Sequence, residues 1–231
     1  MADGTHETRE RGGGSWRQGG HHFGIVLLFI LGSLVFQLAA PEEDWARLTA
    51  IALQGLTLLV ALRASLVRPL ILRLATVVVA VAIVSSIGAY IGFGVLGATA
   101  SRSITVLLVA LAPIAIARGV ILDFRQQGEI TLHTMFGVLC IYLLVGSVFA
   151  FLFGVVDSLS STSFFAQPAA ANTHNLLYFS FVTITTTGYG DLTAATDVGR
   201  SLAIAEALTG QIYLVTVVAA IVGGLSRQRA A

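Results

Sequence analysis

The stretch Thr186-Thr187-Gly188-Tyr189-Gly190-Asp191 decides the fold of this chain. Its alternating glycines permit backbone conformations that side chains penalise. Consecutive carbonyl groups can then point toward one axis, where four such loops would offer rings of oxygens to a cation that has left water. The Thr186 hydroxyl would add a further ring at the inner end, and Tyr189 would point away from the axis and pack behind the loop.

Composition places the whole chain in a membrane. Hydrophobic residues make up 56% of the 231 residues and charged residues 11%, and the mean hydropathy is +0.87. A soluble domain of this size could not carry so much apolar surface. The net charge of +1 offers no electrostatic reason to expect nucleic acid. All 13 basic residues are arginine, which favours a bacterial source, and the lone Cys140 is expected to be a small core residue.

Six apolar segments are long enough to cross a bilayer, which takes about 20 residues. They are Phe23–Ala40, Trp45–Val67, Leu70–Phe93, Ser103–Ile121, Ile130–Val156 and Val198–Leu225. Between the last two lies the shorter run Asn172–Thr185, which suits a re-entrant helix buried in protein, with His174 as its expected cap. The sequence therefore predicts a four-helix part, 23–121, a linker, 122–129, and a pore domain, 130–225.

The arginines orient these segments. With both ends in the cytosol, ten arginines lie inside and three outside, which satisfies the positive-inside rule. The outer three are Arg47, Arg102 and Arg200. We expect a disordered cytosolic tail at 1–22 and a short one at 226–231, with no ligand-binding domain after the sixth segment. The predicted location is the plasma membrane of a bacterium.

The run Thr183–Asp191 resembles the signature of the potassium channel superfamily, most closely in bacterial members with a two-helix pore. The resemblance extends over about seventy residues, through the sixth segment. It implies an all-α membrane protein: a four-fold homotetramer of six-helix chains, each with a pore helix and a filter loop. It also implies that K⁺ is the permeant ion and that no other cofactor is needed. K⁺ would bind at Thr186, Thr187, Gly188 and Tyr189, with Gly190 completing the filter.

The same resemblance assigns the residues that would support the filter. Asp191 corresponds to the acid that bonds an aromatic side chain of the pore helix, and Tyr178 and Phe179 occupy the aromatic pair. Only Tyr178 has a hydroxyl to donate. Val182 stands where some members have a bracing glutamate, so that brace is absent. Thr187 stands where many members have valine; because both side chains are β-branched and stiff, we expect selectivity to survive.

The sixth segment carries the expected gate. Gly210 falls at the position of the family's inner-helix glycine, where it is either a hinge or a point of close helix packing. The cavity and gate are predicted to be lined by Gln211, Leu214, Val218 and Val222. Glu206 is the one acid in the middle of a span. We expect it to bond the back of the pore helix near the Thr183–Thr185 hydroxyls, or to be a polar helix contact without effect on conduction.

The first four segments resemble a voltage sensor in number only. A sensor needs several basic residues at every third position, since each moving charge contributes about 2.3 kcal/mol per 100 mV. The fourth segment has Arg118, with Arg102 at its outer edge. The sequence therefore predicts weak or absent voltage dependence. The alternatives are a transporter, for which no inverted repeat is evident, and a non-conducting scaffold. No residue constellation favours an enzyme.

Overall fold

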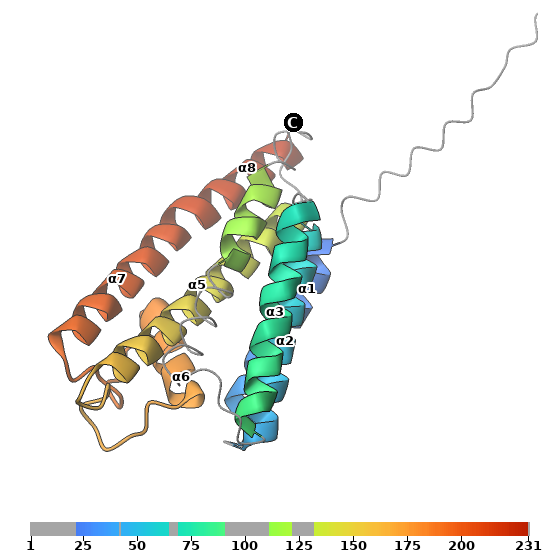
Figure 1. Ribbon diagram of the computed structural model, residues 1–231. Coiled ribbons are helices and arrows are strands. Elements are labelled where there is room, and N and C mark those ends of the chain that lie inside the picture. Colours follow the sequence, from blue (N-terminus) through green and yellow to red (C-terminus); the bar gives the residue numbers. More distant parts are fainter. Residues whose placement is uncertain (1–21, 42, 65–68, 91–110, 122–131, 231) are drawn as a thin grey trace, which may run out of the picture.

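The computed structural model describes residues 22–41, 43–64, 69–90, 111–121 and 132–230 (Figure 1). The predicted tail up to residue 21, the linker 122–129, residues 103–110 of the fourth segment and Arg102 lie outside the described residues. The described part consists of helices and loops, with one isolated β-bridge between Phe165 and Ala194. The predicted all-α class is therefore confirmed for that part of the chain.

A bundle of helices forms one side of the molecule (Figure 1). Its members are α1 (His22–Ala39), α2 (Asp44–Ala64), α3 (Pro69–Tyr90) and the helix Leu111–Ile121. Pro41 follows α1 and Pro69 begins α3, positions that suit a residue without an amide proton. The core of the bundle is made of fully buried aliphatic side chains such as Val26, Ala61 and Ile116.

This bundle packs against the C-terminal part of the same chain, residues 132–230. The backbone oxygen of Phe23 in α1 lies 3.8 Å from the sulfur of Cys140 in α5 (Leu132–Leu159). Gly137 in α5 admits Val120 so closely that an added Cβ would lie 2.4 Å from its Cγ2. Cys140 is fully buried, which confirms the small core residue expected from the sequence.

The C-terminal part has a long helix on each side of a short one. After α5 come α6 (Thr173–Ile184) and α7 (Asp197–Tyr213). The latter continues through a π-helical turn, η1 (Leu214–Val218), into α8 (Ala219–Ala230). Figure 1 shows α6 beside the lower half of α5, and all the loops of this part at that end. The predicted tail 226–231 is helical as far as Ala230, because it consists mainly of good helix formers and no proline stops the helix.

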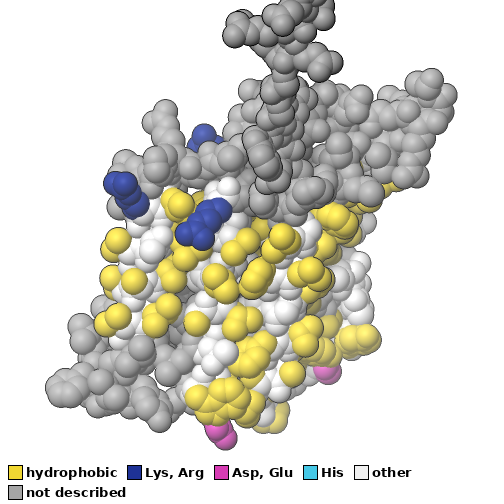
Figure 2. All heavy atoms as spheres, turned by 90° about the vertical axis from the view of Figure 1, so that its right-hand side faces the viewer, with side chains coloured by type: hydrophobic (Ala, Val, Ile, Leu, Met, Phe, Trp, Pro, Cys, Tyr) yellow, Lys and Arg dark blue, Asp and Glu magenta, His cyan; other side chains and the backbone are white. Residues whose placement is uncertain are grey.

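Two described helices are long and apolar enough to cross a membrane, Thr134–Leu159 and Asp197–Gly224. The other apolar helices found by the same criteria are shorter: Phe23–Ala39, Ala52–Arg63 and Leu111–Ile121. Figure 2 shows the outer face of the first bundle, which is apolar across its middle, with arginines toward one end and acidic side chains at the other. This surface is typical of a membrane protein.

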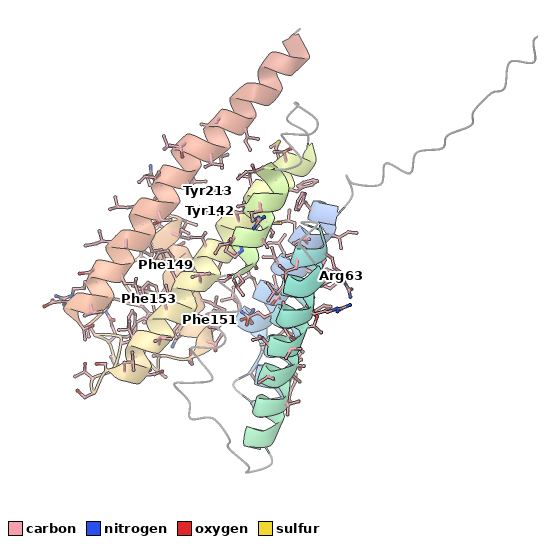
Figure 3. The ribbon with its side chains drawn as sticks, turned by 45° about the horizontal axis from the view of Figure 1, so that its top comes forward. Arg63, Tyr142, Phe149, Phe151, Phe153 and Tyr213 are labelled. Atoms are coloured by element: carbon pink, nitrogen blue, oxygen red, sulfur yellow. The ribbon has the colours of Figure 1, made fainter. Side chains whose placement is uncertain are left out.

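An aromatic cluster anchors the pore helix from behind. Phe153 of α5 is fully buried, and its ring centre lies 5.1 Å from those of Phe164 and Phe179. Phe165 completes the group, 5.7 Å from Phe179 in an edge-to-face contact. In Figure 3, Phe149 and Phe153 lie on successive turns of α5, near its loop end. The cluster holds the loop after α5 against α6.

Candidate functional site

The loop after α6 has an unusual backbone. Thr186, Gly188 and Gly190 have φ angles of +58°, +56° and +79°, and they are the positive-φ residues of the described chain. Residues with positive and negative φ therefore alternate from Thr186 to Gly190. This alternation turns successive amides to one side and successive carbonyls to the other. The glycines were expected from the sequence, but the strained conformation of β-branched Thr186 was not.

The amides of this loop face the pore helix. The Thr186 amide donates to the Thr183 oxygen at 2.9 Å, while the Thr187 and Gly188 amides donate to the Val182 oxygen at 3.0 and 3.2 Å. Among the described groups, none donates a hydrogen bond to the carbonyl oxygens of Thr186–Gly190. The loop is also exposed along its whole length. Its carbonyl oxygens are therefore available to a ligand on the side away from α6.

The pore helix directs its C-terminal end at this loop. Asn172 caps its start by accepting a hydrogen bond from the Asn175 amide at 2.7 Å. His174 is not the cap, contrary to expectation: its Nδ1 lies 2.8 Å from the Leu38 oxygen, at the end of α1. Asn172 stands at the N-cap position, where an amide oxygen accepts well, whereas His174 is already the second residue of the helix. The negative end of the helix dipole at Ile184 favours a cation beside the loop.

A hydrogen bond between α6 and Asp191 holds the C-terminal end of the loop. The Tyr178 hydroxyl donates a hydrogen bond to the Asp191 carboxylate at 2.7 Å, the contact anticipated from the sequence. This bond raises the pKa of Tyr178 above its usual value, since the carboxylate favours the protonated phenol. Phe179 packs in the aromatic cluster, as expected for a side chain without a donor. Val182 and Thr183 serve the loop through the backbone oxygens described above.

A pair of hydroxyl groups at the start of this loop was not predicted from the sequence. The Thr185 hydroxyl lies 2.6 Å from the Phe181 oxygen and 2.8 Å from the Thr187 hydroxyl. The Phe181 carbonyl can only accept, so Thr185 donates to it and Thr187 donates to Thr185. A valine at 187 could not make this bond. The signal was in the sequence, since Thr187 places a second hydroxyl group two residues after Thr185.

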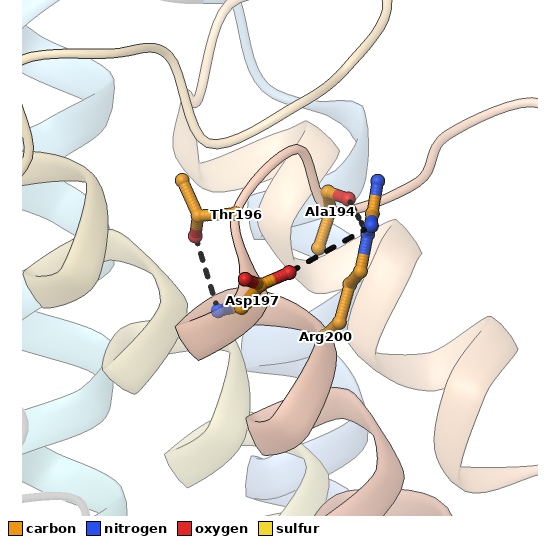
Figure 4. A network of polar contacts seen from close by, with 5 residues as sticks. Ala194, Thr196, Asp197 and Arg200 are labelled. Carbon is orange, nitrogen blue, oxygen red and sulfur yellow. Dashed lines mark hydrogen bonds and ion pairs between the residues drawn. The ribbon is translucent and has the colours of Figure 1, made fainter.

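Two loops, one before α6 and one before α7, are hydrogen-bonded to each other. Gln167 and Thr193 exchange two hydrogen bonds, of 3.0 and 2.9 Å, beside the bridge between Phe165 and Ala194. At the start of α7, the Thr196 hydroxyl accepts from the Gly199 amide, and Arg200 donates to the Ala194 oxygen at 3.1 Å (Figure 4). The exposed ion pair of Arg200 with Asp197, at 3.8 Å, adds little to stability.

Gly210 is a point of close packing. A Cβ added there would lie 2.6 Å from both the Cγ1 and the backbone oxygen of Ile184, the last residue of α6. That same oxygen accepts a hydrogen bond from the Tyr142 hydroxyl at 3.1 Å. Tyr142 in turn stacks on Tyr213, with ring centres 5.9 Å apart between α5 and α7 (Figure 3). Of the two alternatives for Gly210, the structure supports the packing contact.

Glu206 contacts the pore helix at a different residue from the one predicted. Its carboxyl group makes a short hydrogen bond with the Ser180 hydroxyl, and not with the Thr183–Thr185 hydroxyls. The reason is the level at which the helices cross. Because Gly210 lies against Ile184, the residue one turn earlier on α7 meets the residue one turn earlier on α6.

The predicted gate residues do not share one face. Gln211, Leu214 and Val222 are exposed in the single chain, whereas Val218 is half-buried against the core; that the four residues line a cavity and gate stays a prediction. The π-helical turn explains the difference. The Ala219 amide donates to the Leu214 oxygen, five residues back, so one extra residue shifts the helical register. An α-helical spacing counted from Gln211 therefore fails beyond Leu214.

Comparison with known proteins agrees with this geometry. Residues 137–226 match the family model described as "Ion channel". The matched segment starts in α5 and ends in α8, and it contains α6 and the loop of alternating backbone. No curated protein and no solved structure matches the chain. The match supports an ion channel domain over residues 137–226 of the chain.

Proposed function

We propose that this chain forms a potassium-selective channel that conducts K⁺ passively across the membrane. The observation that carries the proposal is the alternating backbone of Thr186–Gly190. Its first three amides are bonded to α6, and none of its carbonyl oxygens accepts a hydrogen bond among the described groups. A row of carbonyl dipoles replaces the hydration shell of K⁺ without adding a fixed charge. The Thr186 hydroxyl would supply the innermost oxygens.

A homotetramer is the assembly that this loop requires. One strand gives only one oxygen at each level, and four strands around an axis give a ring. Two exposed apolar surfaces favour the same assembly. Tyr189 is 71% exposed in the single chain, and the side of α7 away from α5 and α6 carries Ile204, Leu208 and Ile212. In a tetramer these residues would face neighbouring chains or lipid.

The described fourth helix of the first bundle carries too little charge for a voltage sensor. The described helix Leu111–Ile121 contains Arg118 as its one basic residue, and a steep response needs several charges in each chain. We therefore propose weak or absent voltage dependence. The six-span topology, the cytosolic termini and the bacterial plasma membrane belong to the same proposal. The bundle would sit beside the pore helix of its own chain, through the contact between His174 and Leu38.

Ion flux from liposomes tests the proposal. Purified protein is reconstituted, and K⁺, Na⁺ and Cs⁺ fluxes are compared with and without barium. The matched variants are Gly188→Ala, which puts a side chain at φ +56°, and Gly32→Ala, where an added Cβ meets nothing within 4 Å. We expect barium-sensitive flux that favours K⁺ over Na⁺ in the wild type and Gly32→Ala, and not in Gly188→Ala.

The alternatives give different results in the same experiment. A scaffold would show no flux although the tetramer is intact by size-exclusion chromatography. A transporter would show flux that saturates and depends on a second solute gradient. Equal K⁺ and Na⁺ flux would overturn selectivity while leaving an ion channel.

A further inference from the structure

A buried acid joins three helices behind the pore loop. Glu206 of α7 and Ser180 of α6 are both 0% exposed. The Ser180 hydroxyl makes two contacts, a short one with Glu206 Oε1 and one of 2.6 Å with the Gly146 oxygen of α5. Gly146 lacks a side chain, so Phe181 can pack closely on α5 there. The three groups therefore lie in one chain of contacts across the helix junction.

Counting protons assigns the direction of these hydrogen bonds. A serine hydroxyl has one proton, and the Gly146 carbonyl can only accept. If Ser180 gives its proton to Gly146, then Glu206 must donate to Ser180, which requires a protonated carboxyl group. If Glu206 were ionised, Ser180 would donate to it, and the close contact with Gly146 would be two oxygens without a proton between them.

The second carboxyl oxygen of Glu206 also indicates that the carboxyl group is protonated. Glu206 Oε2 is buried and has no hydrogen-bond partner among the described residues. In a neutral acid this atom is a carbonyl oxygen, whose lack of a partner costs little compared with that of a carboxylate oxygen. An ionised Glu206 would have one hydrogen bond and, among the described residues, no cationic partner.

The neighbouring titratable groups are bonded elsewhere. From α5, the Tyr142 hydroxyl donates to the Ile184 oxygen, and Cys140 contacts the Phe23 oxygen. From α7, Tyr213 donates to the Val138 oxygen at 2.7 Å. On α6, Tyr178 is bonded to Asp191. None of these groups supplies a proton or a charge to Glu206.

We propose that Glu206 is a neutral hydrogen-bond donor and a positioning residue of the pore. It donates to Ser180, which donates to Gly146, and this clasp ties the inner and outer helices to the pore helix. One turn further along α6 lies Ile184, and the loop follows directly. The clasp thus sets where the pore helix presents Thr186. Its effect on conduction rests on the proposed channel function, whereas its protonation does not.

Four variants test the clasp: Glu206→Gln, Glu206→Ala, Ser180→Ala and, as the control, Ser147→Ala. The Ser147 hydroxyl is also buried but bonds only Leu143 of its own helix. A glutamine amide can donate to Ser180 as a neutral acid does. We therefore expect Glu206→Gln to keep the thermal midpoint of the tetramer and its flux. Glu206→Ala and Ser180→Ala should each lower flux about tenfold, the usual worth of a buried hydrogen bond.

Infrared spectroscopy in lipid gives a readout that is independent of flux. At neutral pH the wild type should show a carboxylic acid C=O band that Glu206→Gln removes. Absence of that band would overturn the proposal, and so would Glu206→Gln behaving like Glu206→Ala, or Ser180→Ala behaving like Ser147→Ala. If no protein conducts, the channel proposal fails, while the band and the thermal midpoints still decide the clasp.

Discussion

Replacing Gly210 by alanine should push the pore helix away from the inner helix. The new Cβ would start 2.6 Å from the Ile184 backbone oxygen and 2.6 Å from its Cγ1. The side chain can rotate, but the carbonyl belongs to the backbone of the last turn of α6 and accepts a hydrogen bond from Tyr142. Ordinary contact begins near 3.4 Å, so the helices must separate by 3.4 − 2.6 = 0.8 Å.

The energy of this change follows from two opposing effects. Overpacking of a tight contact costs about 1–3 kcal/mol. Alanine favours a helix over glycine by about 1 kcal/mol, which offsets part of that cost. The net loss of up to about 2 kcal/mol corresponds to a shift of up to roughly thirtyfold in the folding equilibrium. Because Ile184 is two residues before Thr186, the shift should also disturb the inner end of the filter.

The assay compares the thermal midpoint of the reconstituted protein and the K⁺-to-Na⁺ flux ratio. Gly210→Ala should lower both. Gly32→Ala is the control, because it adds the same methyl group to a helix where nothing lies within 4 Å; it should leave both unchanged or raise the midpoint. If Gly210→Ala kept the midpoint and the selectivity but changed open probability alone, Gly210 would be a hinge and the packing argument would be refuted.

Three further predictions concern the filter and its helix. Thr187→Val removes the hydroxyl that donates to Thr185, so currents in planar bilayers should decay several-fold faster than in the wild type; identical decay would show that the bond is idle. Asn172→Ala removes the cap of α6 and should lower the stability of the tetramer by about 1 kcal/mol in thermal unfolding, and an unchanged midpoint would contradict that role. Tyr178 has a raised pKa, so its bond to Asp191 is present at neutral pH and is lost only as pH rises past the ordinary tyrosine range of about 10. Tyrosinate absorbance of the wild type minus that of Tyr178→Phe should therefore titrate above that range, and titration below it would be evidence against the bond.

Local sequence predicted the backbone of the site well. Glycines at 188 and 190 stand where φ is positive, and the hydroxyl of Tyr178 finds Asp191. Both are short-range features, since each depends on residue chemistry within about a dozen positions. The apolar runs likewise predicted where the described helices lie, because hydropathy and proline placement act along one segment.

Which residues of different helices contact each other was decided only by the tertiary structure. Glu206 meets Ser180, Gly210 rests on Ile184, and the first bundle lies on α5 of its own chain. Such pairs depend on the level at which two helices cross, which close packing at a glycine decides and no single segment encodes. The π-helical turn at Leu214–Val218 changes the register in the same way, because one added residue rotates everything after it. The sequence by itself therefore determined the loop and the helices, while packing decided which of their side chains meet.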